Sequence, residues 1–262
     1  MLREIYKKAE VMQGIYQMCY PTCEWLSEQE LPEPVCPPEH YFTNEEQELD
    51  EILEIAMFLA HPLGTRIPQV IEQLYKLNLI NFHNLSTAVI QVDPKTSIFR
   101  GVFLPRTLNP FYNACNLIHE AIHAHEIWEY DNPEVAWKTF TNNPFVEAPP
   151  RAAERLIGDP DLPRLTCMSI DMNNSRFLYD MINSGLTQQR LAERYDSIRR
   201  NDFEYLIGGL LGILLSDMIE SKVMSFEDTL VKKGDQPLLT KLKQRGGNAA
   251  TLKHSVQNFF GK

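Results

Sequence analysis

One segment near the middle of the chain constrains the fold most, because both of its ends are marked. Asn109 and Pro110 are typical of a helix start: the asparagine side chain can cap free N–H groups, and proline has no N–H to leave unpaired. The run Asp131-Asn132-Pro133 marks the other end and begins a new helix. The sequence therefore predicts one long helix over residues 110–130 and a second over residues 133–140.

The long helix carries the motif His-Glu-x-x-His at His119, Glu120 and His123. Two histidines four residues apart lie one turn apart on the same helix face, so both imidazoles can reach one metal ion. Glu120 is turned about 100° around the axis. There it can lie beside the metal without binding it and take a proton from a metal-bound water. The motif predicts a metal site with a general base beside it.

The other side chains of this helix divide into two rows. We expect the apolar row to face the core and the polar row to face a cleft. The apolar row comprises Phe111, Ala114, Ile118, Ile122 and His125. The polar row comprises Tyr112, Asn116, His119, His123, Glu126 and Tyr130. Because His125 lies on the apolar row, we expect it to be a buried histidine, hydrogen-bonded to a backbone carbonyl, that is not a ligand.

On these residues the sequence resembles the zincins, the HExxH class of zinc metallopeptidases, over roughly residues 85–157. The resemblance implies Zn²⁺ held by His119 and His123, and hydrolysis of peptide bonds. It also implies a small sheet packed beside the motif helix, with an edge strand that binds the substrate backbone. Residues 98–104, just before the motif helix, are the candidate for that strand.

Catalytic zinc usually has three protein ligands and a water molecule. The chain departs from the metzincin variant, whose third histidine and glycine would fall at Glu129 and Glu126. The gluzincin variant takes a glutamate from a following helix. By this resemblance the third ligand is Glu147, with Glu154 as the alternative and with Glu126, Glu129 and Glu134 as further candidates.

The segment that follows is predicted to be a helix over residues 149–157. If the helical spacing is extended back to residue 147, Glu147, Arg151 and Glu154 share one face.

Zincins often stabilise the oxyanion of the transition state with a later Tyr, His or Arg. Four residues of these types are available, and the sequence does not choose among them. They are Tyr179, Tyr195, Tyr205 and His254.

A second group of possible metal ligands lies nearer the N-terminus and consists of Cys19, Cys23, Cys36 and His40. Two close pairs of sulfur and nitrogen ligands could bind a structural zinc. The prolines between residues 32 and 38 exclude the helix of a C2H2 finger. The simpler interpretation is that these cysteines pack as small apolar residues, as we also expect of Cys115 and Cys167. The chain has 5 cysteines, and an odd number argues against a disulfide framework.

The rest of the chain is mostly helical in pattern, with one β signal. Two β-rich runs, residues 88–92 and 97–104, flank the turn Asp93-Pro94 and predict an antiparallel hairpin. The further helices predicted from apolar spacing cover residues 1–18, 44–59, 66–77, 173–184, 187–199, 202–224 and 236–245. The predicted fold is α+β, predominantly helical, with a small antiparallel sheet beside the motif helix.

The apolar run from Tyr205 to Leu215 contains Gly208 and Gly212. In a membrane helix this spacing promotes dimerisation, but the run is about half of the ~20 residues that a span requires. We interpret it as a buried helix whose glycines let another backbone approach closely.

Charge and terminal sequence narrow the partners and the compartment. Asp and Glu total 35 against 25 Lys and Arg, a net charge of −10, which disfavours nucleic acid as a partner. No apolar signal core and no span is present, so the cytoplasm is the default location, and export without an N-terminal signal stays open.

We expect residues 1–43 to form a helix and a Pro/Cys-rich segment, and residues 44–262 a catalytic domain with a helical subdomain over about 160–262.

These inferences lead to one expected function and one alternative. We expect a zinc-dependent metallopeptidase that hydrolyses a protein or peptide substrate, with Glu120 activating the zinc-bound water. The alternative is a zincin-like domain without peptidase activity that serves as a binding module. The sequence identifies neither the substrate nor the oligomeric state.

Overall fold

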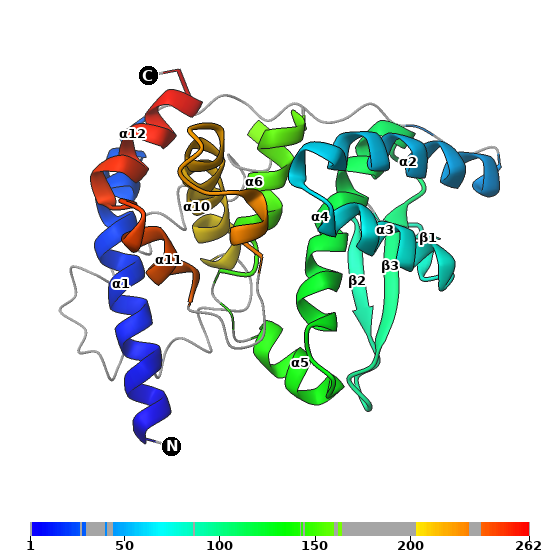
Figure 1. Cartoon of the computed structure of the whole chain (residues 1–262), viewed down its shortest axis with the longest axis horizontal. Helices are drawn as coiled ribbons and strands as arrows, with labels where there is room; N and C mark the ends of the chain where they lie inside the picture. Colours follow the sequence, from blue (N-terminus) through cyan, green and yellow to red (C-terminus); the bar gives the residue numbers. More distant parts are fainter. Residues whose placement is uncertain are drawn as a thin grey trace.

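The computed structural model describes residues 2–26, 28–29, 40, 44–85, 87–141, 143, 145–159, 162–163, 203–230 and 237–261. These residues form a predominantly helical α+β fold with one small sheet, in agreement with the predicted class (Figure 1). The helices are α1 Leu2–Leu26, α2 Glu45–Ala60, η1 His61–Leu63, α3 Arg66–Lys76, α4 Pro110–Trp128, α5 Pro133–Thr141, α6 Ala148–Ile157, α10 Phe203–Glu220, η2 Phe226–Asp228, α11 Leu238–Gln244 and α12 Ala249–Phe259. The helices predicted over 173–184 and 187–199 lie outside the described residues.

The sheet has three strands in the order β1-β3-β2, with β1 Ile80–His83, β2 Val89–Val92 and β3 Phe99–Pro105. β2 and β3 form the predicted antiparallel hairpin. β1, which the sequence pattern did not predict, pairs with β3 in parallel, so the sheet is mixed. β3 is therefore the central strand, and the expectation that residues 98–104 form an edge strand was wrong. The edges are β1 and β2.

Local hydrogen bonds explain where several elements begin. The side chains of Asn44 and Asn109 accept hydrogen bonds from first-turn N–H groups of α2 and α4. In the hairpin turn, the carboxylate of Asp93 accepts hydrogen bonds from two backbone N–H groups and from the guanidinium of Arg100. These polar residues therefore mark element boundaries, as expected from the sequence.

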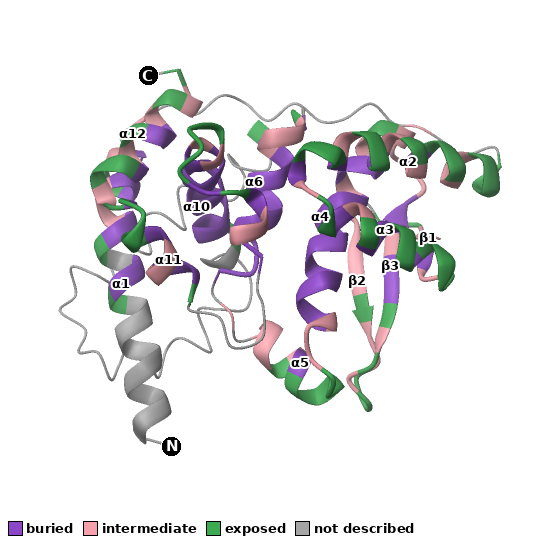
Figure 2. Ribbon diagram, in the orientation of Figure 1, coloured by how far each residue is buried: buried purple, intermediate pink, exposed green. Residues whose placement is uncertain are grey.

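α4 is the central helix of the fold. It contacts α2, α3, α6 and the sheet, and each of its residues from 113 to 127 except Asn116 is classed as buried (Figure 2). The expected division into a core row and a cleft row is thus too simple. Phe111, on the predicted core row, is 37% exposed, while His119 and His123 on the polar row are buried. The polar row is buried because α6 packs against this side of α4.

The N-terminal helix packs against the C-terminal part of the chain. α1 lies beside α12, a helix that the sequence analysis did not predict, and α10 lies between this pair and α6 (Figure 1). One continuous cluster of buried apolar side chains joins α1, α2, α4, α6, α10 and α12. The proposed boundary at residue 43 remains a prediction. No helix in the described ranges has the length and apolar character to cross a membrane.

Candidate metal centre

Three of the predicted site residues meet between α4 and α6. The Nε2 atoms of His119 and His123 lie 3.0 Å apart. The carboxylate of Glu147 faces both rings: its Oε2 is 3.3 Å from Nε2 of His119, and its Oε1 is 3.5 Å from Nε2 of His123. All three residues are buried. Within the described part of the chain, no other group of three His, Cys, Asp or Glu side chains is arranged to hold a metal ion.

The backbone explains how these side chains converge. His119 and His123 lie one turn apart in the middle of α4. Glu147 is the N-cap residue of α6, and Pro149 and Pro150 follow within the first helical turn. Prolines are tolerated there because the N–H groups of a first turn have no partner within the helix. The two prolines therefore allow a helix to start at the residue that faces both histidines.

Glu154, the alternative third ligand, lies on the other side of the His119 ring from Glu147. Its Oε1 lies 2.7 Å from Nδ1 of His119, the ring nitrogen that faces away from the cluster. Its carboxylate also accepts two hydrogen bonds from Nη1 of Arg151, at 3.0 and 2.8 Å. A carboxylate at Nδ1 fixes the ring orientation and the tautomer of a ligating histidine. Glu154 thus orients His119 so that its Nε2 faces Glu147 and His123.

This support could have been inferred from one sequence signal. Glu147, Arg151 and Glu154 fall on one helical face, so all three side chains can reach the same neighbour. The identity of the nitrogen that each one faces depends on how α6 packs against α4.

The electrostatics of the cluster favour positive charge. Burial alone disfavours a charged imidazolium at His119, but contacts with Glu147 and Glu154 outweigh burial and raise its pKa to about 10. Burial would likewise raise the pKa of Glu147, yet the two histidines hold it well below its usual range. For Glu154, Arg151 and His119 overcome burial and lower the pKa. Carboxylates at this cluster remain ionised, which suits a cation between them.

The ligand atoms fit a metal ion in separation and in chemistry. Zinc bonds of about 2.0–2.2 Å at tetrahedral angles place neighbouring ligand atoms about 3.3–3.6 Å apart. The two Nε2 atoms lie 3.0 Å apart, each is 3.3–3.5 Å from one of the two oxygens of Glu147, and one ligand atom from each residue lies within 4.8 Å of the other two. Oε2 of Glu147 is buried and accepts no hydrogen bond from any described residue. Two imidazoles and a carboxylate are also a donor set that zinc accepts.

Glu120, the predicted general base, is buried on α4 beside the cluster. Its pKa is raised by burial, against the opposing charges of His119 and His123. It is not one of the three residues whose ligand atoms converge. A carboxylate beside a metal cluster but outside its ligand set can exchange a proton with a bound water.

The other candidate ligands on α4 and α5 do not join the cluster. Glu126 is buried and accepts a hydrogen bond from Nδ2 of Asn143 at 2.8 Å. Glu129 pairs with Arg66 at 2.9 Å. Glu134 is exposed in the first turn of α5. None of these three glutamates is therefore among the residues whose ligand atoms converge.

His125 is buried, as predicted, and Nε of Arg66 donates to its Nδ1 at 3.3 Å. This hydrogen bond comes from an arginine side chain, whereas the sequence predicted a bond to a backbone carbonyl, and Oε1 of Glu129 lies 3.7 Å from the same nitrogen. Cys115 is buried on α4, as expected of a core cysteine, and Cys167 lies outside the described residues.

Aromatic rings of α5 border the cluster, a feature that the sequence analysis did not identify. The ring of Phe140 meets that of His123 edge-on, with centroids 5.3 Å apart. Trp137 stacks on Phe140 at 5.6 Å. Phe140 thus contacts the ring of His123, which is buried.

The predicted cysteine group is divided between two parts of the molecule. Cys19 and Cys23 are buried on α1. The ring of His40 lies 3.1 Å from Oε1 of Glu48 on α2. Figure 1 shows α1 and α2 at opposite ends of the molecule. The structure does not bring His40 to the two cysteines, and Cys36 lies outside the described residues.

The candidates for oxyanion stabilisation are only partly described. Tyr205 lies in the first turn of α10, about one turn before Gly208, which lies against Glu147, and it is 45% exposed. His254 is exposed on α12 and pairs with Asn258 at 3.2 Å. Tyr179 and Tyr195 lie outside the described residues. Of the two described candidates, Tyr205 is the one near the cluster.

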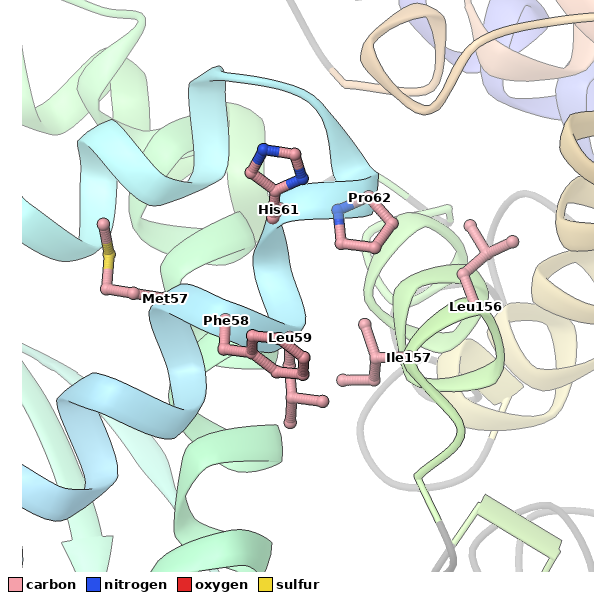
Figure 3. A pocket seen from close by; sticks show the side chains of 7 residues that line it. All are labelled: Met57, Phe58, Leu59, His61, Pro62, Leu156 and Ile157. Carbon is pink, nitrogen blue, oxygen red and sulfur yellow. The ribbon is translucent and has the colours of Figure 1, made fainter.

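A separate apolar pocket of about 500 Å³ lies between the end of α2 and the last turn of α6 (Figure 3). None of the cluster residues lines it. The lining residues are Met57, Phe58, Leu59, His61, Pro62, Leu156 and Ile157. The first turn of α6 thus faces the cluster, while its last turn faces this pocket.

Comparison with protein-family models, with curated proteins and with solved structures found no match for the chain. The chemistry of the cluster therefore carries the functional assignment.

Proposed function

We propose that this protein is a zinc-dependent metallopeptidase of the gluzincin type. His119, His123 and Glu147 would hold the zinc ion. The observation that carries the proposal is the convergence of these three buried side chains, one ligand atom of each lying within 4.8 Å of the others, with Glu120 on the same helix as the two histidines. The HExxH motif at His119, Glu120 and His123 is the feature by which the chain resembles the zincins.

Each residue around the cluster has a separate task in this proposal. Zinc, when bound, lowers the pKa of a water molecule and polarises a carbonyl oxygen. The carboxylate of Glu120 would take the proton of that water and return it to the leaving amine. Glu154, held by Arg151, would keep Nδ1 of His119 protonated so that Nε2 remains free to bind the metal.

The experiment that tests this function is Glu120→Gln, assayed for cleavage of a peptide library and for zinc content. Gln retains the size of the side chain but cannot accept the proton. We expect zinc content equal to wild type and turnover lower by about 10²–10⁴-fold. Glu129→Gln is the matched control, because Glu129 ends the same helix and pairs with Arg66 away from the cluster. It should cleave as wild type does.

Two outcomes would contradict the proposal. If Glu120→Gln cleaves as well as wild type, Glu120 is not the general base. If wild-type protein binds zinc at the cluster but cleaves no peptide, the domain hydrolyses another kind of bond or serves as a binding module.

A further inference from the structure

α10 packs beside α6 (Figure 1). Two of its glycines, Gly208 and Gly212, lie against Glu147 and Arg151 at the start of α6. A Cβ atom added at Gly208 would overlap the Cβ of Glu147 and lie 3.0 Å from its carbonyl carbon. A Cβ atom added at Gly212 would lie 2.5 Å from the Cβ of Arg151 and 3.0 Å from the backbone nitrogen of Ala152. Because backbone and Cβ atoms cannot yield at such separations, an alanine at either position would push α6 away from α10.

The register of this contact matches the spacing of the site. Gly208 and Gly212 are four residues apart on α10, as Glu147 and Arg151 are at the start of α6, so each glycine faces one member of the pair. Gly209 is the next residue of α10, yet a Cβ added there would meet no atom within 4 Å. The close approach is therefore confined to the face of α10 that carries Gly208 and Gly212.

Both residues that rest on these glycines determine the geometry of the cluster. Glu147 contributes the carboxylate that faces His119 and His123, and its Oε2 is buried without a hydrogen bond from any described residue. Arg151 holds Glu154, which in turn binds Nδ1 of His119. An outward shift of α6 would move Glu147 directly and would loosen His119 through Arg151 and Glu154.

We propose that Gly208 and Gly212 are positioning residues for the metal centre, which place Glu147 and, through Arg151 and Glu154, His119. Neither glycine touches the metal. The inference deepens the proposed function and rests on it in one respect: a metal ion must bind at His119, His123 and Glu147.

The test compares Gly208→Ala, Gly212→Ala and Gly209→Ala in the full-length protein, with Zn²⁺ affinity measured by competition with a chromophoric chelator. The three variants make the same substitution within one helix and gain the same helix propensity. They differ in what the new methyl group meets. We expect Gly208→Ala to lower Zn²⁺ affinity by about 10–100-fold and Gly212→Ala by about 10-fold, the range seen when outer-shell partners of a metal are removed. Gly209→Ala should stay within about twofold of wild type.

Co²⁺ in place of Zn²⁺ supplies a second readout, since its visible absorption reports the geometry of the ligands. The bands of Gly208→Ala should shift in position or intensity, and those of Gly209→Ala should match wild type. A general loss of stability would not by itself alter the spectrum of the folded fraction.

Three results would overturn the proposal. Equal affinities and equal spectra in Gly208→Ala and Gly209→Ala would do so while leaving the proposed function intact. Failure of both Gly208→Ala and Gly212→Ala to fold, judged by circular dichroism beside a folded Gly209→Ala, would show that the glycines serve the fold itself. A wild-type protein that binds neither ion would overturn the proposed function together with this inference.

Discussion

This protein has two pairs of residues of metal-binding types, each with its members four positions apart on one helix, and the surroundings of the two pairs differ. On α4, His119 and His123 face the carboxylate of Glu147 across the boundary with α6. On α1, Cys19 and Cys23 are buried in the apolar core. Burial raises the pKa of the Cys19 thiol well above its usual value and that of Cys23 to about 12, which disfavours the thiolate that a metal needs.

The difference shows what the helical spacing does and does not determine. Four-residue spacing brings two side chains to one face of a helix. A metal centre also needs a facing element that supplies another ligand and holds the rings in place. α6 supplies both for α4. Around Cys19 and Cys23, no described His, Cys, Asp or Glu completes such a group.

The largest expected effect comes from removing the facing carboxylate with Glu147→Gln. Outer-shell partners are worth about 10–100-fold in metal affinity, and a charged ligand should be worth more. We expect Zn²⁺ affinity, measured by chelator competition, to fall by more than about 100-fold. Glu126→Gln is the control, because it neutralises a buried carboxylate of α4 that lies outside the cluster. Equal affinities in the two variants would mean that Glu147 is not a ligand.

Glu126 itself shows what burial costs a carboxylate whose favourable contacts, with Asn143 and His123, do not outweigh burial. Burial raises its pKa from 4.5 to about 7, although Asn143 donates a hydrogen bond to it. Between these pH values the native state holds a proton that the unfolded chain releases, so the free energy of unfolding falls as pH rises through the window. The shift corresponds to a loss of up to about 3 kcal/mol.

Glu126→Gln tests this cost, because the amide oxygen can still accept the hydrogen bond of Asn143. We expect the variant to match wild type near pH 4.5 and to be the more stable protein near pH 8. Urea unfolding at several pH values measures the difference. A wild-type protein whose stability rises between these pH values, with no change in the variant's advantage, would contradict the assignment.

Glu154→Gln weakens the support of His119 and retains all three ligands. The amide oxygen can accept the hydrogen bond of Nδ1, but the negative charge that balances Arg151 is lost. We expect Zn²⁺ affinity to fall by about 10-fold, less than in Glu147→Gln. Glu129→Gln, at the end of α4, should leave the affinity unchanged. An effect of Glu154→Gln as large as that of Glu147→Gln would indicate that Glu154 binds the metal directly.

The smallest effect on metal binding is expected for the cysteine pair of α1, in the double variant Cys19→Ala/Cys23→Ala. Each change deletes a small buried group at a cost of about 1 kcal/mol, as for a buried methyl. Metal content should equal that of wild type, because these thiols pack in the core. Loss of one metal ion per chain in this variant would establish a second site and remove the contrast between the two helices.

Sequence reasoning succeeded where the signals are local. The bounds of α4 follow from Asn109 and Pro110 at its start, and the structure shows that the Asn109 side chain does cap the first turn. His119 and His123 converge because a helix leaves no freedom in their spacing. The buried run with Gly208 and Gly212 is likewise a helix that another backbone approaches closely.

Prediction from the sequence failed where contacts between distant segments determine the secondary structure. β1 is only four residues long, and it is a strand because it pairs with β3 in parallel. One signal was available in β3: Gly101 has φ +137° and lies too close to the carbonyl oxygen of Leu79 to tolerate a Cβ. A lone glycine within a strand pattern often marks such an approach. It would have placed another segment beside β3 and kept that strand from the edge.

The choice between Glu147 and Glu154 was also beyond the sequence. Both lie on the same face of the segment, and both meet His119. Their roles depend on which ring nitrogen each one faces, Nε2 for Glu147 and Nδ1 for Glu154. That difference is set by the packing of α6 against α4 and α10.

The central claim is that His119 and His123 bind a metal ion, and elemental mass spectrometry tests it most directly. Purified wild type should carry one zinc per chain, and His119→Ala/His123→Ala should carry none. A wild-type protein without metal, or a double variant that retains it, would contradict the account.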